Sequence, residues 1–318
     1  MKIKLYLSML VFSLMFLGSW LSAQQESVTG YYDSANEWFV FEYTSPEYGH
    51  RKIIYDPNNK IDPEIYAYVF RDDSTGVHIY NFKVSNGNKA KQLLDTIVIK
   101  FSATIYGQTA PSIEWYMSEY RAGRTDTWKW SKTRGKPSGI PPGELQDGFS
   151  FRSKGLPAIV DMFFWGERRV RFSGPSPTYD SDEIHESFNR VFESLKIQYP
   201  NMKKTVTIKT IGPKDPPADF KPIDFLNYII SLKHEAYNLG WIKNAGIEQS
   251  LDAKFDNAKK KIEQGNIEAA KNILNAFINE VEAQGCVTYE DCSSGKHISP
   301  EAYALLKYNV QYLISNLR

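Results

Sequence analysis

The chain has 318 residues, of which 42% are hydrophobic and 24% charged, a composition that suits a globular protein of about two domains. Its 38 Lys and Arg side chains nearly balance its 37 Asp and Glu side chains, giving a net charge of +1. This balance excludes the one-sided basic surface that nucleic-acid binding requires, so we expect no nucleic-acid partner.

Residues 1–23 have the pattern of a secretory signal peptide. Lys2 and Lys4 precede an apolar core over residues 5–17, and a small-residue cleavage site precedes Gln24. The alternative is an uncleaved anchor, but two serines interrupt a core that is short for a membrane span. We therefore expect cleavage, no membrane span in the mature chain, and a secreted or periplasmic protein.

Residues 24–212 predict a β-sandwich domain. Short runs rich in β-branched and aromatic residues alternate with turn residues, without regularly interleaved helices, which favours an antiparallel sandwich. One amphipathic helix is expected at residues 182–196. The expected strands are residues 38–43, 52–55, 66–71, 77–84, 96–101, 113–117, 127–130, 149–151, 159–165, 170–172 and 205–209. The blocks at residues 66–70, 84–86, 141–143, 148–151 and 155–157 resemble a secreted β-sandwich of unassigned role.

Residues 213–222 contain four prolines among charged residues. Such a segment is extended and fairly stiff. It predicts a spacer between two independently packed domains.

Residues 223–318 predict a small antiparallel helical bundle. Apolar residues recur at helical spacing in four stretches. Gly265 suits a helix end and Asn266 suits the cap of the next helix. Ser299 and Pro300 are an N-cap followed by proline at the first helical position. Four amphipathic helices with short connections bury their apolar stripes by packing antiparallel.

Several separated blocks of this region, in order, resemble the FIMAH domain. They are Leu239-Gly240-Trp241-Ile242, Gln264-Gly265-Asn266, and residues 275–284, 295–298 and 301–306. The resemblance covers roughly residues 223–318 and implies a C-terminal accessory module of a secreted bacterial protein. It implies no catalytic residues.

The two cysteines, Cys286 and Cys292, lie between the third and fourth expected helices. An even count in an exported chain favours a disulfide. The alternative is a metal site with His297, but two thiolates and one imidazole leave zinc one ligand short. We expect a disulfide and no metal.

Trp128 and Trp130 lie two apart on an expected strand, so both side chains project to one face. They could stack on the sugar rings of a polysaccharide, or they could form the inward face of the core. On another expected strand, Ile113, Trp115 and Met117 alternate in the same way, and we expect these three side chains to belong to the core.

Two charged clusters have two interpretations each. The acidic one could bind Ca²⁺ or could complement a helix N-terminus. The basic one could hold an anion or could be a solvated strand face. Their members are Asp180, Asp182, Glu183, His185 and Glu186 for the first, and Arg168, Arg169 and Arg171 for the second.

Motifs of catalysis or cofactor binding are absent from the sequence: it has no nucleophile elbow, no zinc-protease histidine pair, no P-loop and no dinucleotide-binding glycines. We expect no cofactor. The first hypothesis is a secreted, non-catalytic protein that binds a polysaccharide or a cell-surface component. The alternative is an extracellular polysaccharide hydrolase or lyase, whose paired carboxylates need only meet in space.

Overall fold

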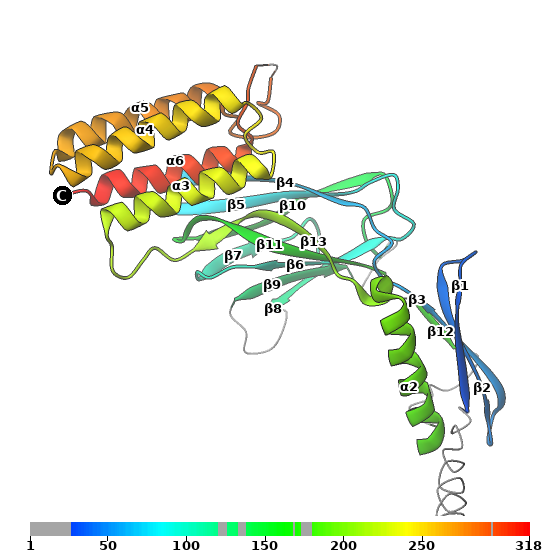
Figure 1. Cartoon of the computed structure of the whole chain (residues 1–318). Helices are drawn as coiled ribbons and strands as arrows, with labels where there is room; N and C mark the ends of the chain where they lie inside the picture. The colour runs from blue at the N-terminus through cyan, green and yellow to red at the C-terminus, as the bar shows by residue number, and fades with distance from the viewer. Residues whose placement is uncertain (1–26, 120–125, 133–137, 168, 173–179, 294) are drawn as a thin grey trace, which may run out of the picture. The chain divides into compact units, whose positions relative to one another are not determined.

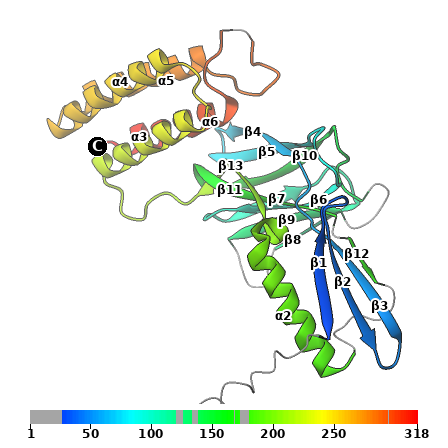
Figure 2. The ribbon, with the colours of Figure 1, turned by 45° about the vertical axis from the view of Figure 1, so that its right-hand side comes forward.

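The computed structural model describes residues 27–119, 126–132, 138–167, 169–172, 180–293 and 295–318. The chain divides into two compact units, which are described separately below (Figures 1 and 2). The first comprises Met1–Pro57 and Arg168–Lys204, and the second comprises Asn58–Glu167 and Thr205–Arg318. The expected signal peptide and its cleavage site lie outside the described residues. No helix within the described ranges is long and apolar enough to cross a membrane.

The first unit is a four-stranded antiparallel sheet with one helix packed against it. Ser181 caps this helix by accepting the N–H of Ile184 at 3.3 Å. The rings of Phe188 and Phe192 pack on Phe41 with centroids 4.8 and 5.8 Å apart. The sheet order is β1 (Val28–Asp33), β2 (Trp38–Ser45), β3 (Gly49–Asp56) and β12 (Arg169–Phe172), and the helices are α2 (Asp182–Gln198) and the short 3₁₀ helix η2 (Pro200–Lys203).

The second unit begins with two antiparallel sheets that face each other, which confirms the expected sandwich. Their aromatic core includes Phe82, Phe151 and Trp130. The first sheet has the order β4 (Pro63–Asp72), β5 (Val77–Asn86), β10 (Glu144–Ser153) and β7 (Ile105–Thr109). The second has the order β13 (Val206–Lys214), β11 (Leu156–Gly166), β6 (Leu94–Lys100), β9 (Thr127–Lys132) and β8 (Trp115–Glu119).

Two strands, β1 and β7, have no counterpart among the expected runs. Strand β8 begins only at Trp115, and Ile113, which we expected inside a strand and in the core, is fully exposed. Trp115 itself is buried, as expected. The expected helix at residues 182–196 is α2.

Four helices complete the second unit. They are α3 (Pro222–Asn238), α4 (Ala245–Glu263), α5 (Ile267–Gln284) and α6 (Pro300–Asn316). Asn266 Oδ1 accepts the N–H of Ala269, and Ser299 Oγ accepts that of Ala302, so both expected caps are present. Each helix packs on the next and α3 also packs on α6, around one apolar core. The chain is thus an all-β plus all-α protein.

The division of the chain differs from the expected one in three ways. The sheet formed by β1, β2, β3 and β12 is not part of the sandwich. It forms its own unit with α2, because these elements share a separate core. The helical bundle is part of the same compact unit as the sandwich, because Ala304 and Tyr308 of α6 enter the sandwich core. The expected spacer also begins late, since Pro213 lies within β13, an edge strand where a missing N–H is tolerated.

Helix α6 makes polar contacts along the edge of β4. Glu301 is 3% exposed, and its carboxylate accepts the backbone N–H of Ala67 at 3.2 Å. The same carboxylate accepts the hydroxyls of Tyr289 and Ser299. About two helical turns further along α6, the hydroxyl of Tyr308 donates to the carbonyl of Val69 at 3.2 Å. The helix therefore occupies hydrogen-bonding positions that a further strand would otherwise take.

The loop between α5 and α6 also packs on the first sandwich sheet. Cys286 and Cys292 are joined by a disulfide in this loop. Between them, the ring of Tyr289 meets that of Tyr66 on β4 at 4.9 Å, edge to face. Glu290 forms an ion pair with Lys83 on β5. The disulfide thus closes the segment that carries these two contacts.

His78, on β5, is a buried histidine whose two ring nitrogens have no hydrogen-bond partner. Burial, with a smaller effect of the nearby Arg71 charge, lowers the pKa of His78 to about 4. The folded protein therefore holds this ring neutral at pH values where an unfolded chain would protonate it.

We predict that two substitutions of Glu301 distinguish the contribution of its hydrogen bonds to stability from the contribution of its charge. Glu301→Ala leaves buried donors unpaired and should lower the free energy of unfolding by about 3 kcal/mol, at about 1–3 kcal/mol for each unpaired group. Glu301→Gln keeps an acceptor and removes a carboxylate whose pKa is raised by burial, so it should stay closer to the wild type. Urea denaturation at pH 7 measures both variants. Equal losses would contradict the contacts described.

We also predict a pH-dependent contribution from His78. Because its folded pKa lies below that of the unfolded chain, its contribution is complete above about pH 6.5 and is lost as the pH falls toward 4. When the pH is lowered from 7 to 5, the free energy of unfolding of the wild type should fall by about 2 kcal/mol more than that of His78→Leu. Urea denaturation at both pH values tests this prediction. Burial raises the pKa of Asp95 to about 6, but the pH-dependent contribution of Asp95 is the same in both proteins and does not affect the difference between them. Parallel pH curves would refute the assignment.

Candidate functional sites

Trp128 and Trp130 of β9 do not form a pair of exposed rings that could stack on a polysaccharide. Trp130 is fully buried between the two sheets, stacked on Phe151 with centroids 6.2 Å apart, and its indole N–H donates to the Thr109 carbonyl at 2.9 Å. It is a core residue and cannot contact a ligand, because the facing sheet covers it. Trp128, on the same side of the strand but nearer its start, stays partly exposed.

A hollow of about 570 Å³ lies beside Trp128 at one end of the sandwich. The strands β7, β8 and β9 and the segment after β13 supply its polar walls. The acidic and amide side chains that line it, with the indole of Trp128, are Gln108, Glu119, Asp126 and Asp215. An aromatic ring among several hydrogen-bond acceptors is suited to a polyhydroxylated ligand.

The wall around Trp128 has unused hydrogen-bonding capacity. The Trp128 indole N–H, the Thr127 hydroxyl and one carboxylate oxygen of Asp126 are buried without a protein partner. The backbone carbonyl of Asp126 holds the N–H of Phe101 at 2.9 Å, which ties the start of β9 to the end of β6. Such groups ordinarily find a water or a ligand.

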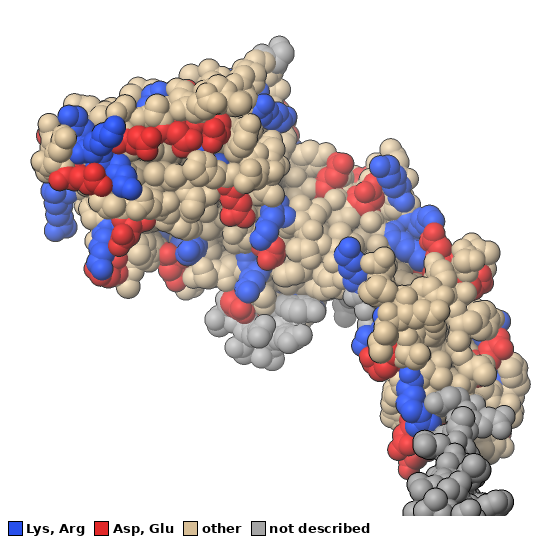
Figure 3. All heavy atoms as spheres, viewed as in Figure 1, with Lys and Arg blue, Asp and Glu red and all other residues tan. Residues whose placement is uncertain are grey.

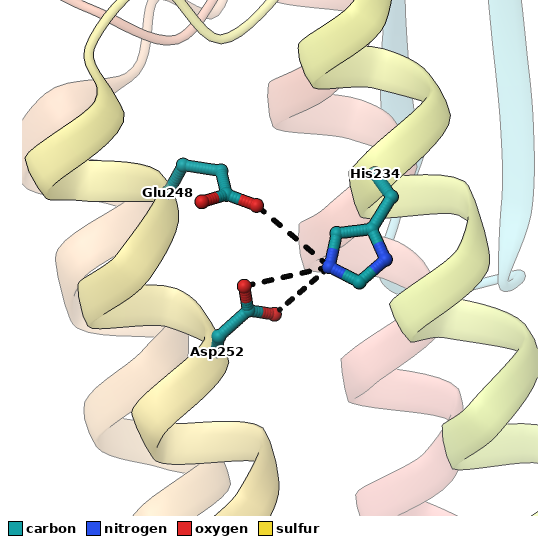
Figure 4. A group of neighbouring side chains, drawn as sticks. All are labelled: His234, Glu248 and Asp252. Carbon is teal, nitrogen blue, oxygen red and sulfur yellow. Dashed lines mark hydrogen bonds and ion pairs between the residues drawn. The ribbon is translucent and has the colours of Figure 1, made fainter.

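A second cluster joins α3 to α4 (Figure 4). His234 of α3 points toward Glu248 and Asp252, which are one turn apart on α4. His234 Nε2 lies 3.3 Å from Asp252 Oδ1 and 3.7 Å from Glu248 Oε1. Among the described residues, these form the one group of His, Cys, Asp and Glu side chains close enough to share a metal ion.

Lys233 supplies a positive charge to this cluster. Its side chain is completely buried, and its ammonium group lies 2.7 Å from Asp252 Oδ2 and also pairs with Glu248. Burial raises the pKa of Asp252, but the hydrogen bond and charge of Lys233 outweigh it and leave this pKa below its usual value. Both carboxylates are therefore held in place from one side.

Of the two charged clusters expected from the sequence, only the acidic one has side chains that the structure describes. The acidic side chains Asp182 and Glu183 lie in the first turn of α2, where carboxylates complement the helix dipole. This group contains no set of potential ligands within metal-sharing distance among the residues described. Arg168 lies outside the described residues, as do the side chains of Arg169 and Arg171.

A smaller hollow, of about 190 Å³, lies where β11 and β13 meet α3 and α6. Leu156, Phe225 and Tyr228 give it apolar walls. The Lys214 ammonium sits 4.4 Å from the centre of the Tyr228 ring. Burial, with the Glu235 charge, raises the pKa of Tyr228 to about 12, so this phenol stays protonated at neutral pH.

The fold places the chain in a structural class, and one part of the chain matches a known domain family. The described residues combine an antiparallel β-sandwich with a bundle of helices. Residues 234–315, from α3 to α6, match the FIMAH domain, which confirms the resemblance seen in the sequence. FIMAH domains occur in extracellular bacterial proteins.

The other comparisons of this chain with known proteins add little. No curated protein matches it. A crystal structure of an uncharacterized protein from Nocardia farcinica, described as having an immunoglobulin-like fold, is similar over 48% of this chain and 98% of its own, with 12% identity. The TM-score is 0.26, and a likeness this weak supports no conclusion about this chain.

Little in the sequence indicates the cluster between α3 and α4. His234 appears there only beside Glu235, which suggests no metal motif, and the four-residue spacing of Glu248 and Asp252 is common on solvated helices. The sequence indicates only Trp128 of the hollow, because its three carboxylates are far apart in the chain: Glu119 ends β8, Asp126 precedes β9 and Asp215 follows β13.

We predict that the two tryptophans contribute unequally to the free energy of unfolding. Trp130→Ala should lower the free energy of unfolding by about 3–5 kcal/mol, because it empties a packed site between the sheets. Trp128→Ala should cost less than about 2 kcal/mol, because its ring already contacts solvent. Guanidinium denaturation of the whole chain measures both. A larger loss for Trp128→Ala would mean that Trp128 is the core residue of the pair.

Proposed function

We propose that this is a secreted surface-interaction protein whose β-sandwich binds a neutral polysaccharide in the hollow beside Trp128, without turning it over. The observation that carries the proposal is the composition of this hollow: one partly exposed indole among Gln108 and the three carboxylates. The FIMAH match and the disulfide support an extracellular location.

The chemistry of the hollow sets the ligand class. The face of an indole packs against the C–H face of a sugar ring, and this contact contributes about 1–3 kcal/mol for a well-covered ring. Carboxylates and the Gln108 amide accept hydrogen bonds from sugar hydroxyls. Acidic lining repels uronates and sulfated sugars, so we expect a neutral chain. On the face seen in Figure 3, acidic and basic side chains are otherwise interspersed.

Affinity electrophoresis and calorimetry test the proposal with soluble neutral glucans, xylans and mannans. One ring implies a Kd in the millimolar to high micromolar range. Trp128→Ala should weaken binding about tenfold or more without unfolding the domain. Phe70→Ala is the matched control, since Phe70 is 41% exposed on β4 and does not line the hollow. Polyuronates should bind less than the neutral chains.

Two results would overturn the proposal. The first is a wild-type protein that retains none of the neutral polysaccharides. The second is a Trp128→Ala protein that binds as well as the wild type.

A hydrolase or lyase is the second candidate, because the same hollow brings Glu119, Asp126 and Asp215 together. Glycoside hydrolysis needs two carboxylates about 5–10 Å apart. Release of reducing ends from a bound neutral polysaccharide would favour hydrolysis, whereas release of unsaturated sugars would require a uronate chain, which the acidic lining disfavours. Such activity should then disappear in Glu119→Gln or Asp126→Asn while binding persists.

A further inference from the structure

We propose that His234, Glu248 and Asp252 bind a divalent transition-metal ion, with Zn²⁺ as the first candidate. The site lies in the FIMAH region, between α3 and α4, and is independent of the polysaccharide hollow. Imidazole nitrogen and carboxylate oxygen are both established ligands of zinc.

The spacing of the three ligand atoms fits a shared ion. With metal–ligand bonds of about 2.0–2.1 Å, two ligands of a tetrahedral ion lie about 3.3 Å apart. The observed distances from His234 Nε2 are 3.3 Å to Asp252 Oδ1 and 3.7 Å to Glu248 Oε1. The three ligand atoms all lie within 4.8 Å of one another, so small side-chain movements would bring them to one ion and leave the fourth position for water.

The two helices hold these ligands from rigid positions. Glu248 and Asp252 are one turn apart and project to the same side of α4, toward His234. Leu232, two positions before His234, and Leu251, one position before Asp252, lie in the helical core and fix the facing turns. The imidazole is half exposed, so an ion can reach it from solvent.

Lys233 has two effects on such a site. Its ammonium group orients the two carboxylates by bonding each of them. Its charge also opposes the ion, because the pair of carboxylates keeps only one net negative charge beside it. We therefore expect micromolar rather than nanomolar affinity, and tighter binding once this positive charge is removed.

Titration of the metal-free full chain with Zn²⁺ in a calorimeter tests the inference. We expect one ion per chain and a rise in melting temperature on saturation. His234→Ala should weaken this binding at least tenfold. His185→Ala is the matched control, since His185 lies on α2 in the other compact unit and should leave the binding unchanged.

A charge variant gives a second, opposite readout. Lys233→Met should lower stability without metal, because it leaves two carboxylates unpaired, and should bind Zn²⁺ at least tenfold more tightly than the wild type. Zn²⁺ should then raise its melting temperature more than that of the wild type. Failure of the wild type to bind Zn²⁺, or equal binding by wild type and His234→Ala, would overturn the inference.

Discussion

The edge of strand β4 in the first sandwich sheet is the constraint on which the second unit depends. An edge strand presents backbone N–H and C=O groups that must be paired or hydrated. Here α6 covers them: Glu301 accepts the Ala67 N–H and Tyr308 donates to the Val69 carbonyl. The helix also lends apolar side chains to the sandwich core, so the accessory bundle is a structural part of the β domain rather than an appendage.

Local signals account for what could be predicted of the fold. Asn266 and Ser299 cap their helices through hydrogen bonds to residues three positions away, so nearby sequence suffices to place these helix starts. Strand partners are different, because β12 pairs with β3 although more than a hundred residues separate them in the sequence. Nothing in either run specifies that pairing, which is why the sequence suggested one β domain where the structure has two separate cores.

The sites show the same limit at the level of single side chains. The two-residue spacing of Trp128 and Trp130 correctly places both rings on one side of β9. Whether that side is covered depends on the length and position of the facing sheet, which buries Trp130 and leaves Trp128 at the end. Likewise, His234 gains its partners only because α3 packs on α4, a contact between segments joined by a turn whose geometry the sequence does not specify.

The interleaved order of the two units has a consequence for synthesis. The first unit is interrupted by Asn58–Glu167 and is complete only when Lys204 has been made. The second must wait for α6, since its residue Glu301 bonds a strand made 234 positions earlier. A nascent chain therefore carries β4 with a bare edge through most of translation, the interval in which unpaired edges seek wrong partners. A factor that shields this edge until the last helix emerges would raise the yield of native protein.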